Sequence, residues 1–352
     1  MQTGELKPGG PRSAGSIPQR RIPQPWPSTR RFRILSLDGG GIRGIFPATI
    51  LAELERRFGQ GYRLAQYFDL IAGTSTGGIL ALGLGAGLSA DDLRRLYVEK
   101  GSEIFPARDQ SLAGRIRSLG RSTRHWFAYL YDREALESLL SARLGEKLFG
   151  DSQSRLCIPA FDGKHSEVFV YKTPHHRDYK YDRFERMVVV GLATSAAPTY
   201  FQPFRHGGYQ LVDGGVWANN PIMLAVIEVL TCFTVTTEQI DVLSISCGED
   251  PYIVSTRHIF GGKLAWADSI FAAMRLQSLA ATNQARLLLG PPAVTRLQPR
   301  QYQPPIPLDD FSRAIFELPK DAIEVVDSHA DAVRAKFFGE IANPYVPVPL
   351  EA

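Results

Sequence analysis

The sequence has few cysteines and no long hydrophobic run. Its three cysteines, Cys157, Cys232 and Cys247, are odd in number and widely spaced, a pattern that favours neither a disulfide framework nor a zinc site. Apolar stretches such as residues 79–88 and 222–230 are shorter than the roughly 20 residues of a membrane-spanning helix. No apolar leader follows the N-terminus. We therefore expect a protein of the reducing cytoplasm with no metal site.

Basic charge is concentrated at the start of the chain. The formal net charge is +4, and residues 1–31 hold six basic residues and one acid, which leaves the rest of the chain near about −1. These residues are rich in Pro, Gly and Ser and show no apolar period. We predict that residues 1–31 form a disordered, solvated tail rather than a dedicated lipid or nucleic-acid contact. The nearly neutral remainder argues against a nucleic-acid polymer as partner.

Strand-like and helix-like segments alternate after this tail. Residues 32–37 and 67–73 are β-rich apolar runs, and each is followed by glycines and then by a helical pattern. The other predicted strands cover residues 155–160, 167–171, 210–212 and 241–246, and later helices cover residues 187–197 and 263–289. This alternation predicts an α/β fold with a mainly parallel sheet that is covered on both faces.

Residues 73–77, Gly-Thr-Ser-Thr-Gly, match the G-x-S-x-G pattern of a nucleophile elbow. Small residues around Ser75 allow a tight turn that holds its hydroxyl clear of the backbone. Glycine and serine also occur together in ordinary loops, but a position between a strand and a helix favours the catalytic interpretation. Ser75 is therefore the candidate nucleophile.

A serine hydroxyl is a weak nucleophile and needs a base beside it. The seven histidines are His125, His165, His175, His176, His206, His258 and His329, and none lies in a loop typical of an α/β-hydrolase histidine. Asp213 follows an apolar strand and precedes two glycines, so it can deliver a carboxylate to the sheet edge that carries Ser75. An ordinary Asp-Gly-Gly turn is the alternative.

Residues 35–44, LSLDGGGIRG, place three consecutive glycines between a strand and a helix. The backbone N–H groups of such a turn can approach an anion closely, and acyl transfer needs donors for a transient oxyanion. Gly39, Gly41 and Gly44 also fit a dinucleotide fingerprint. That alternative is disfavoured, because the second strand ends in the serine turn rather than an acid and no Walker lysine follows either glycine turn.

Three motifs in this order, DGGGIRG at 38–44, GTSTG at 73–77 and DGG at 213–215, resemble those of the patatin-like phospholipases, as does ATSAAPTYF at 193–201. The resemblance covers roughly residues 32–250. It implies a patatin-like three-layer α/β/α fold, with a catalytic core at 32–250 and a C-terminal extension at 251–352 packed on the same domain.

The resemblance also implies a role for each motif residue. Ser75 and Asp213 would form a catalytic dyad without histidine. The glycine turn would form the oxyanion hole, with Gly39, Gly40 and Gly41 as its members and Arg43 as its positive and ordering element. Asp38 is expected to hold this turn through hydrogen bonds to its backbone. The remaining motif glycines are Gly44, Gly73, Gly77, Gly214 and Gly215.

Within this family the chain looks most like the bacterial cyclic-oligonucleotide-activated phospholipases of antiphage (CBASS-type) defence. That likeness implies a cytoplasmic enzyme that acts peripherally on phospholipids of the inner membrane, needs no cofactor for catalysis, and allows a homodimer. A cyclic di- or trinucleotide from a partner synthase would activate it, and the candidate ligand contacts are Arg257, His258, Lys263, Arg275 and Gln277.

Three alternatives remain open. The fold can belong to a catalytically silent ligand-binding or assembly protein, or to an unregulated patatin-like esterase. The basic and aromatic segment 104–131 suits an anionic bilayer or, equally, a solvated loop that leads to a buried aromatic anchor.

Overall fold

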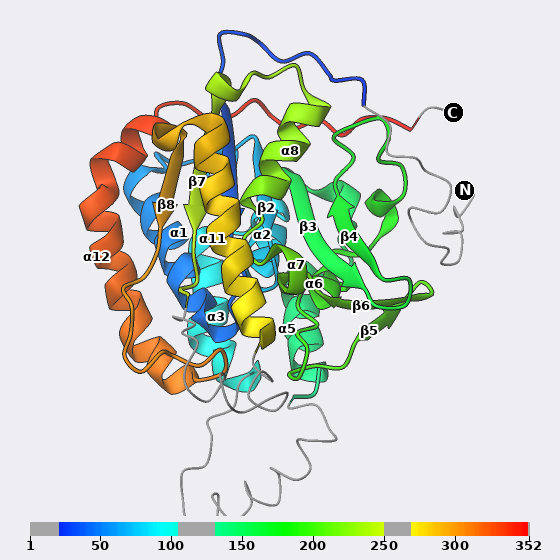
Figure 1. Ribbon diagram of the computed structural model, residues 1–352, viewed down its shortest axis with the longest axis vertical. Helices are drawn as coiled ribbons and strands as arrows, with labels where there is room; N and C mark the ends of the chain where they lie inside the picture. The colour runs from blue at the N-terminus through cyan, green and yellow to red at the C-terminus, as the bar shows by residue number, and fades with distance from the viewer. Residues whose placement is uncertain (1–20, 105–130, 250–268, 351–352) are drawn as a thin grey trace, which may run out of the picture.

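A central sheet runs through the part of the chain that the computed structural model describes, residues 21–104, 131–249 and 269–350 (Figure 1). Its strands follow the order β5-β6-β3-β2-β1-β7-β8, and β4 pairs with β3. They are β1 Phe32–Leu37, β2 Leu70–Gly73, β3 Arg155–Asp162, β4 Glu167–Lys172, β5 Phe204–His206, β6 Tyr209–Asp213, β7 Ile240–Ile245 and β8 Val294–Leu297. The five strands from β3 to β8 are parallel, whereas β4, β5 and β6 pair antiparallel at one edge. The predicted mainly parallel sheet is confirmed.

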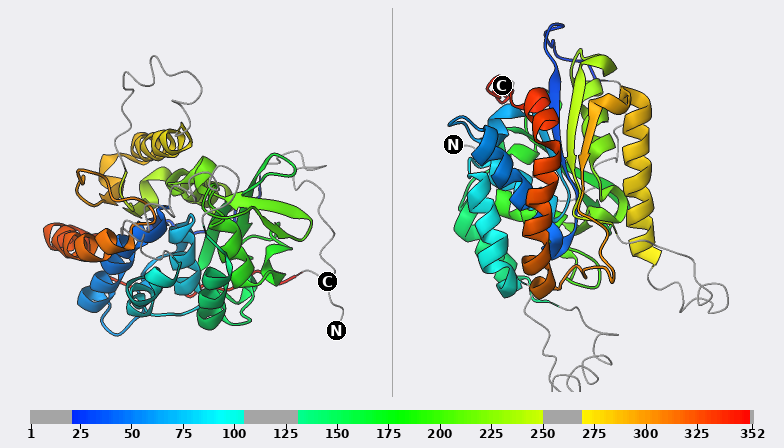
Figure 2. Two further views of the ribbon diagram at one scale, coloured as in Figure 1. Left: turned by 90° about the horizontal axis from the view of Figure 1, so that it is seen from below. Right: turned by 90° about the vertical axis from the view of Figure 1, so that its left-hand side faces the viewer.

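Helices cover both faces of this sheet. They are α1 Ile45–Phe58, α2 Thr76–Gly85, α3 Ala90–Ile104, α5 Glu134–Leu144, α6 Met187–Thr194, α7 Gly215–Ala218, α8 Ile222–Cys232, α11 Ser269–Leu289 and α12 Phe311–Phe337. Figure 2 shows α1, α3 and α12 on one side of the strands and α8 and α11 on the other. This is the expected three-layer α/β/α fold. Among the described residues, no helix combines the length and hydrophobicity needed to cross a bilayer.

The alternation of side chains along β1 explains why both faces are covered. Leu35 and Leu37 pack into the core beneath α1, α2 and α12, whereas Phe32 and Ile34 pack into a second core beneath α8 and α11. Successive strand residues point to opposite faces, and every residue of β1 is buried. A strand that is buried at every position therefore needs a helical layer on each side.

Residues near the C-terminus complete both the sheet and one helical layer. β8 pairs in parallel with β7, and α12 packs against α1. We did not predict α12, and Pro319 lies inside it. A proline in a helix removes a backbone donor and normally signals a break. Here the apolar face of α12, which includes Leu318 and Phe337, is buried in the core and keeps the helix continuous.

The prediction of a disordered tail is wrong for residues 21–31. Gln24 pairs with the backbone around Phe233, because its N–H donates to Cys232 O at 2.8 Å and its carbonyl accepts from Thr234 N at 2.8 Å. The ring of Trp26 packs against Phe233 with centroids 5.7 Å apart. Apolar contact and backbone pairing thus fix a segment whose composition indicated disorder. Residues 1–20 lie outside the described part of the chain.

Candidate active site

The serine turn connects β2, which ends at Gly73, to α2, which begins at Thr76. Ser75 has φ +54° and ψ −120°, a backbone conformation that is strained for a residue with a Cβ atom. A Cβ on Gly77 would lie 2.2 Å from the carbonyl oxygen of Leu37, and one on Gly73 would lie 2.1 Å from the carbonyl oxygen of Gly77. Both glycines are therefore required where this turn meets the backbone.

Thr194 connects the serine turn to its surroundings. Its hydroxyl oxygen accepts a hydrogen bond from the Ser75 N–H at 3.0 Å and donates one to Pro159 O at 2.6 Å. Its carbonyl oxygen accepts from Gly214 N at 3.4 Å. One buried residue thus links the serine turn, strand β3 and the turn that follows Asp213. We did not assign Thr194 a role from the sequence, although it lies within the 193–201 motif.

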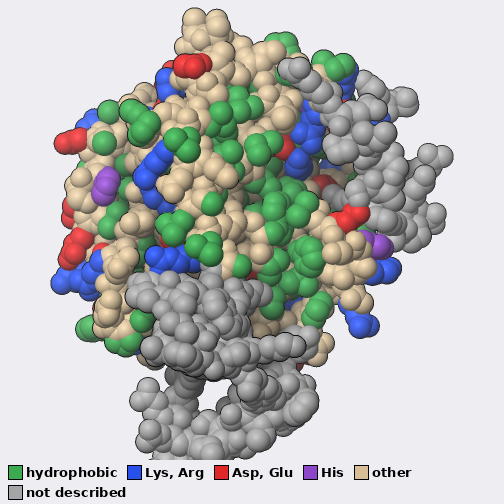
Figure 3. Space-filling view, viewed as in Figure 1, with side chains coloured by type: hydrophobic (Ala, Val, Ile, Leu, Met, Phe, Trp, Pro, Cys, Tyr) green, Lys and Arg blue, Asp and Glu red, His purple; other side chains and the backbone are tan. Residues whose placement is uncertain are grey.

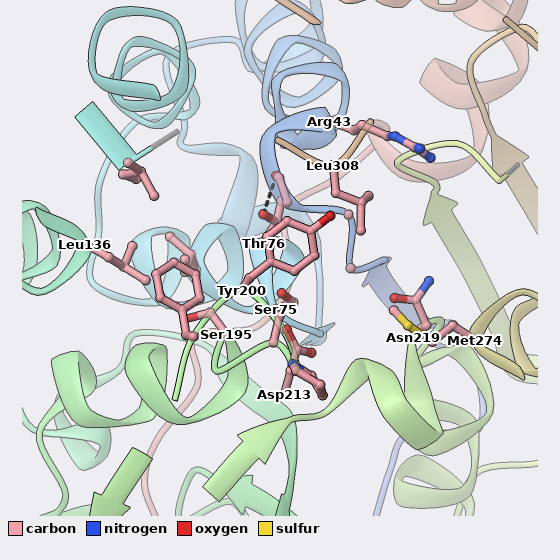
Figure 4. A pocket seen from close by; sticks show the side chains of 18 of the residues that line it. Arg43, Ser75, Thr76, Leu136, Ser195, Tyr200, Asp213, Asn219, Met274 and Leu308 are labelled. Carbon is pink, nitrogen blue, oxygen red and sulfur yellow. Dashed lines mark hydrogen bonds between the residues drawn. The ribbon is translucent and has the colours of Figure 1, made fainter. Parts of the chain in front are cut away.

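Asp213 is the last residue of β6, and its side chain lies beside Ser75 (Figure 4). One carboxylate oxygen accepts a hydrogen bond from Gly215 N at 2.7 Å. A Cβ on Gly214 would lie 2.3 Å from Pro159 O, so only glycine lets the chain turn away from β3 here. The antiparallel strand β6 thereby delivers its terminal carboxylate to the serine turn.

Burial raises the pKa of Asp213 from its ordinary 3.8 to about 6. Hydrogen bonds from the Ser75 hydroxyl and the Gly215 N–H oppose this rise, because they stabilise the charged carboxylate. An ordinary aspartate is a weak base. With its pKa near 6, Asp213 is still ionised at neutral pH and holds a proton more readily than an exposed aspartate.

The glycine turn places two free donors at the cavity. The Gly39 N–H is not available to a ligand, because it donates a hydrogen bond to Asn219 O at 3.0 Å. The hydroxyl of Thr76 donates to Gly41 O at 2.6 Å and fixes that peptide. Among the residues that the structure describes, the N–H groups of Gly40 and Gly41 have no acceptor, and both glycines line the cavity that Ser75 lines.

Arg43 ties the glycine turn to two other backbone segments. Its guanidinium donates to Ile306 O at 2.5 Å and to Gly248 O at 3.3 Å. Figure 4 shows the guanidinium pointing away from Ser75 and Asp213. The side chain therefore orders the turn and is not aimed at the reacting groups.

Asp38 has a different partner from the one we expected. Its carboxylate does not hold the glycine turn by bonds to that turn's own backbone. It accepts two hydrogen bonds from the guanidinium of Arg296 in β8, at 2.9 and 2.5 Å. Arg296 also donates to the Ser244 hydroxyl at 2.7 Å. An isolated buried carboxylate is costly, and a bidentate arginine compensates its charge.

Replacing Arg296 with glutamine is expected to lower the free energy of unfolding by about 3 kcal/mol, because Asp38 stays buried without a counter-charge. Denaturant unfolding of the variant and the wild type measures this loss. Arg300 is the matched control, since it is 56% exposed in its pair with Glu317, and Arg300→Gln should cost much less because solvent screens an exposed pair. Equal losses in the two variants would contradict a structural role of the buried pair.

The serine turn opens into a cavity of about 430 Å³. Its polar lining includes Ser75, Asp213 and the glycine turn. The rest is largely apolar and includes Ile79, Leu96, Ile104, Leu136, Leu139, Leu140 and Phe201. A mostly apolar cavity with a few convergent polar groups is typical of a small-molecule site, and these side chains suit a hydrocarbon chain better than a charged ligand.

The described histidines lie elsewhere. They are His165, His175, His176, His206 and His329, and none of these five lines the cavity. His165 pairs with Asp162, and His206 pairs with Glu185 at 3.0 Å. Within the described part of the chain, Asp213 is therefore the titratable group in contact with Ser75.

A buried group of Cys157, His175 and Glu228 has the residue types of a metal site. Glu228 is already occupied, because it accepts from Lys172 Nζ at 2.5 Å and lies 3.1 Å from His175 Nε2. A lysine cation at that distance neutralises the carboxylate and opposes a second cation. These residues do not line the cavity.

Two of the five expected ligand contacts, Arg275 and Gln277, lie in the described part of the chain. Arg257, His258 and Lys263 lie outside the described residues, as do residues 105–130 of the basic and aromatic segment. Arg275 lines the cavity. Gln277 exchanges two hydrogen bonds with the backbone of Asn220, both at 3.1 Å, so its amide serves to dock α11 onto the start of α8.

Fold and site together define an α/β protein in which a buried aspartate contacts the serine of a strand-to-helix turn. Comparison with known families agrees, because the family described as "Patatin-like phospholipase" matches residues 35–226. The chain belongs to the patatin-like phospholipase family. This assignment favours the hydrolase interpretation of the glycine turn over the dinucleotide alternative.

Two curated relatives are both described as "cGAMP-activated phospholipase". The protein from Escherichia coli (strain TW11681) is 39% identical over 233 residues, which cover 62% of this chain and 63% of the relative. The protein from Vibrio cholerae serotype O1 is 39% identical over 209 residues, or 56% of this chain and 58% of the relative. The match thus spans about three fifths of each relative. Among solved structures, VipD from Legionella pneumophila aligns over 86% of this chain and 67% of its own, with 14% identity and a TM-score of 0.40.

Proposed function

We propose that this protein is a lipid acyl hydrolase that cleaves membrane phospholipid esters with a Ser75–Asp213 dyad. The observation that carries the proposal is the meeting of Ser75 and Asp213 in a largely apolar cavity. The descriptions of the relatives as phospholipases support this substrate class. The protein would act in the cytoplasm at the inner face of the membrane.

The first half of the reaction forms an acyl-enzyme. Ser75 Oγ attacks the ester carbonyl while Asp213 accepts the hydroxyl proton. The carbonyl oxygen becomes an oxyanion, and we assign its stabilisation to the N–H groups of Gly40 and Gly41, since Gly39 is engaged with Asn219. Asp213 then returns the proton to the departing alcohol oxygen as the ester C–O bond breaks.

The second half releases the fatty acid. Water attacks the acyl-enzyme carbonyl and gives a proton to Asp213, the same oxyanion forms, and the bond to Ser75 Oγ breaks as that oxygen regains a proton. One carboxylate thus serves as base and acid in both halves. A pKa near 6 suits this double role, because proton transfer works best when the pKa lies near the working pH.

The rate of ester hydrolysis should depend on pH through Asp213. The base must be unprotonated, so kcat/KM is expected to rise about tenfold per pH unit below about pH 6 and to level off above it. Initial rates with a soluble short-chain ester across this range measure the profile. A flat profile, or an inflection that disappears only when a histidine is replaced, would contradict Asp213 as the base.

We further propose that a cyclic di- or trinucleotide from a partner synthase switches the enzyme on, as part of antiphage defence. The printed descriptions of the relatives support this regulation. The activator must bind the active arrangement better than the resting one, and a hundredfold shift needs about 2.7 kcal/mol of differential affinity. A ligand-linked homodimer is one arrangement that can supply it.

Release of fatty acid from phospholipid vesicles, with and without a panel of cyclic di- and trinucleotides, tests both proposals. Hydrolysis that requires one of the nucleotides would support them together. Full hydrolysis without any nucleotide would leave an unregulated patatin-like esterase. No hydrolysis with any member of the panel would favour the silent ligand-binding or assembly protein and overturn the proposed activity.

A further inference from the structure

Helix α11 exposes large apolar side chains and buries small or polar ones, unlike an ordinary surface helix. A helix on a globular protein normally buries its large apolar side chains and exposes its polar ones. On α11 the buried side chains are small or polar, namely Ser278, Ala281, Thr282 and Ala285. The exposed ones include four leucines, Leu276 (63%), Leu279 (42%), Leu287 (87%) and Leu288 (44%). This arrangement leaves an apolar surface that the described part of the chain does not cover.

The exposed apolar side chains lie on α11 and on the helix beside it. Leu276, Ala280, Asn283 and Leu287 follow one another at helical spacing, all are exposed, and the spacing puts them on one face. On the neighbouring α8, which contacts α11, Ile227 is 53% exposed. Figure 3 shows hydrophobic side chains gathered over these two helices. We call Ile227, Leu276, Leu279, Leu287 and Leu288 the leucine face.

The charges around this face suit an anionic surface. The sequences of α8 and α11 contain one acidic residue, Glu228. Its carboxylate is buried and paired with Lys172. The basic residues of the two helices are Arg275 and Arg286, and Arg286 is exposed. Glu238, in the short 3-10 helix at residues 237–239 that contacts α11, is the exposed acid of the neighbouring described elements. A surface whose own helices expose arginine and no acid can lie against an anionic bilayer with little charge repulsion.

The leucine face is continuous with the candidate active site. Met274 and Arg275, in the same helix and directly before Leu276, line the cavity. Helix α11 packs on α7, the short helix that begins two residues after Asp213. The two hydrogen bonds between Gln277 and Asn220 fix α11 to the start of α8. The face and the dyad are therefore held in a fixed relation.

We infer that the leucine face is the surface by which this protein docks on a phospholipid bilayer, so that a lipid can enter the cavity beside α11. This inference rests on the proposed lipid hydrolase function and names the surface that serves it. The occupant is a bilayer rather than a protein, because the cavity that the helix lines suits a hydrocarbon chain and because the face carries arginine and no exposed acid.

The test compares the double variant Leu276→Ser/Leu287→Ser with a matched control. Phe316 on α12 is 85% exposed and lies on the opposite side of the sheet, so Phe316→Ser removes a similar exposed apolar group elsewhere. Each change is also made in a Ser75→Ala background, in which lipid is not consumed. Binding is measured by co-sedimentation with vesicles of phosphatidylcholine and phosphatidylglycerol.

Removing two leucines from the bilayer contact is expected to weaken vesicle binding by at least about tenfold, whereas Phe316→Ser leaves it unchanged. In the Ser75-containing proteins, supplied with whichever cyclic nucleotide activates them, the double variant should lose vesicle hydrolysis to the same extent. It should keep its rate on a soluble short-chain ester within about twofold, because the dyad does not depend on the leucines.

Two results would overturn the inference. One is vesicle binding by the double variant that equals that of the wild type. The other is a wild-type dimer that the double variant converts to a monomer in the absence of lipid, since the face would then be a contact between copies of this chain. Vesicle binding that depends on the leucines, in a protein that hydrolyses neither substrate, would support the docking surface while the proposed activity fails.

Discussion

Replacing Ser75 with alanine is expected to reduce ester hydrolysis by on the order of a thousandfold or more without changing the fold. The variant loses only the attacking oxygen. Its Cβ stays in place, and the strained backbone at φ +54° was already occupied by a residue with a Cβ atom. The hydrogen bond that fixes this turn comes from the Ser75 N–H to Thr194, which alanine keeps.

Hydrolysis of a soluble ester and of vesicle lipid measures this loss, and denaturant unfolding checks the fold. The control is Ser152→Ala, since Ser152 is also buried and its hydroxyl donates to Ser154 O at 2.8 Å, but it does not line the cavity. The control should keep its rate within about twofold. A Ser75→Ala protein with wild-type activity would exclude the serine mechanism.

Replacing Asp213 with asparagine is expected to have two opposite effects, on activity and on stability. The amide cannot accept the serine proton, so hydrolysis should fall by on the order of a thousandfold. The folded protein, however, loses a buried carboxylate whose charged form is disfavoured. Burial raises the pKa of Asp213 above its ordinary 3.8 to about 6, so the wild type loses stability as the pH rises through that range.

The size of this stability effect follows from the shift in pKa. A rise from 3.8 to about 6 corresponds to a loss of up to about 3 kcal/mol for the wild type above pH 6. Asparagine does not titrate. The difference in free energy of unfolding, variant minus wild type, should therefore increase between about pH 4 and about pH 8.

Denaturant unfolding at both pH values measures that difference, because groups that titrate in both proteins cancel. Asp321→Asn is the matched control: Asp321 is buried on α12, accepts from Tyr302 at 3.0 Å and does not line the cavity. It should keep its catalytic activity. An Asp213→Asn variant that remains active, or whose stability difference from the wild type is independent of pH, would contradict the assigned base.

The features that could be predicted from the sequence are those that a short stretch of neighbouring residues determines. The serine turn is specified within five residues, since Gly73 and Gly77 are needed where the turn meets the backbone. The mainly parallel sheet follows from alternating apolar runs, and the placement of Asp213 at the end of β6 follows from an apolar strand that stops at an acid. No knowledge of distant contacts was needed for any of these.

The parts that the sequence did not predict depend on distant partners. Asp38 meets Arg296, which lies 258 residues further along the chain, and no local pattern indicates that pairing. Gly39 donates to Asn219, so the fold is needed to see that Gly40 and Gly41 are the glycines of the turn that we propose as oxyanion donors. The prediction from composition is wrong at residues 21–31, because composition does not indicate that Trp26 packs against Phe233.

The partners that hold the glycine turn are synthesised long after the turn itself. Arg43 is held by Ile306 O, 263 residues later, and Asp38 by Arg296. At roughly 5–20 residues per second, the ribosome reaches these partners on the order of ten to fifty seconds after the turn is made. In a nascent chain the glycine turn therefore lacks these two partners until residues 296–306 have been made.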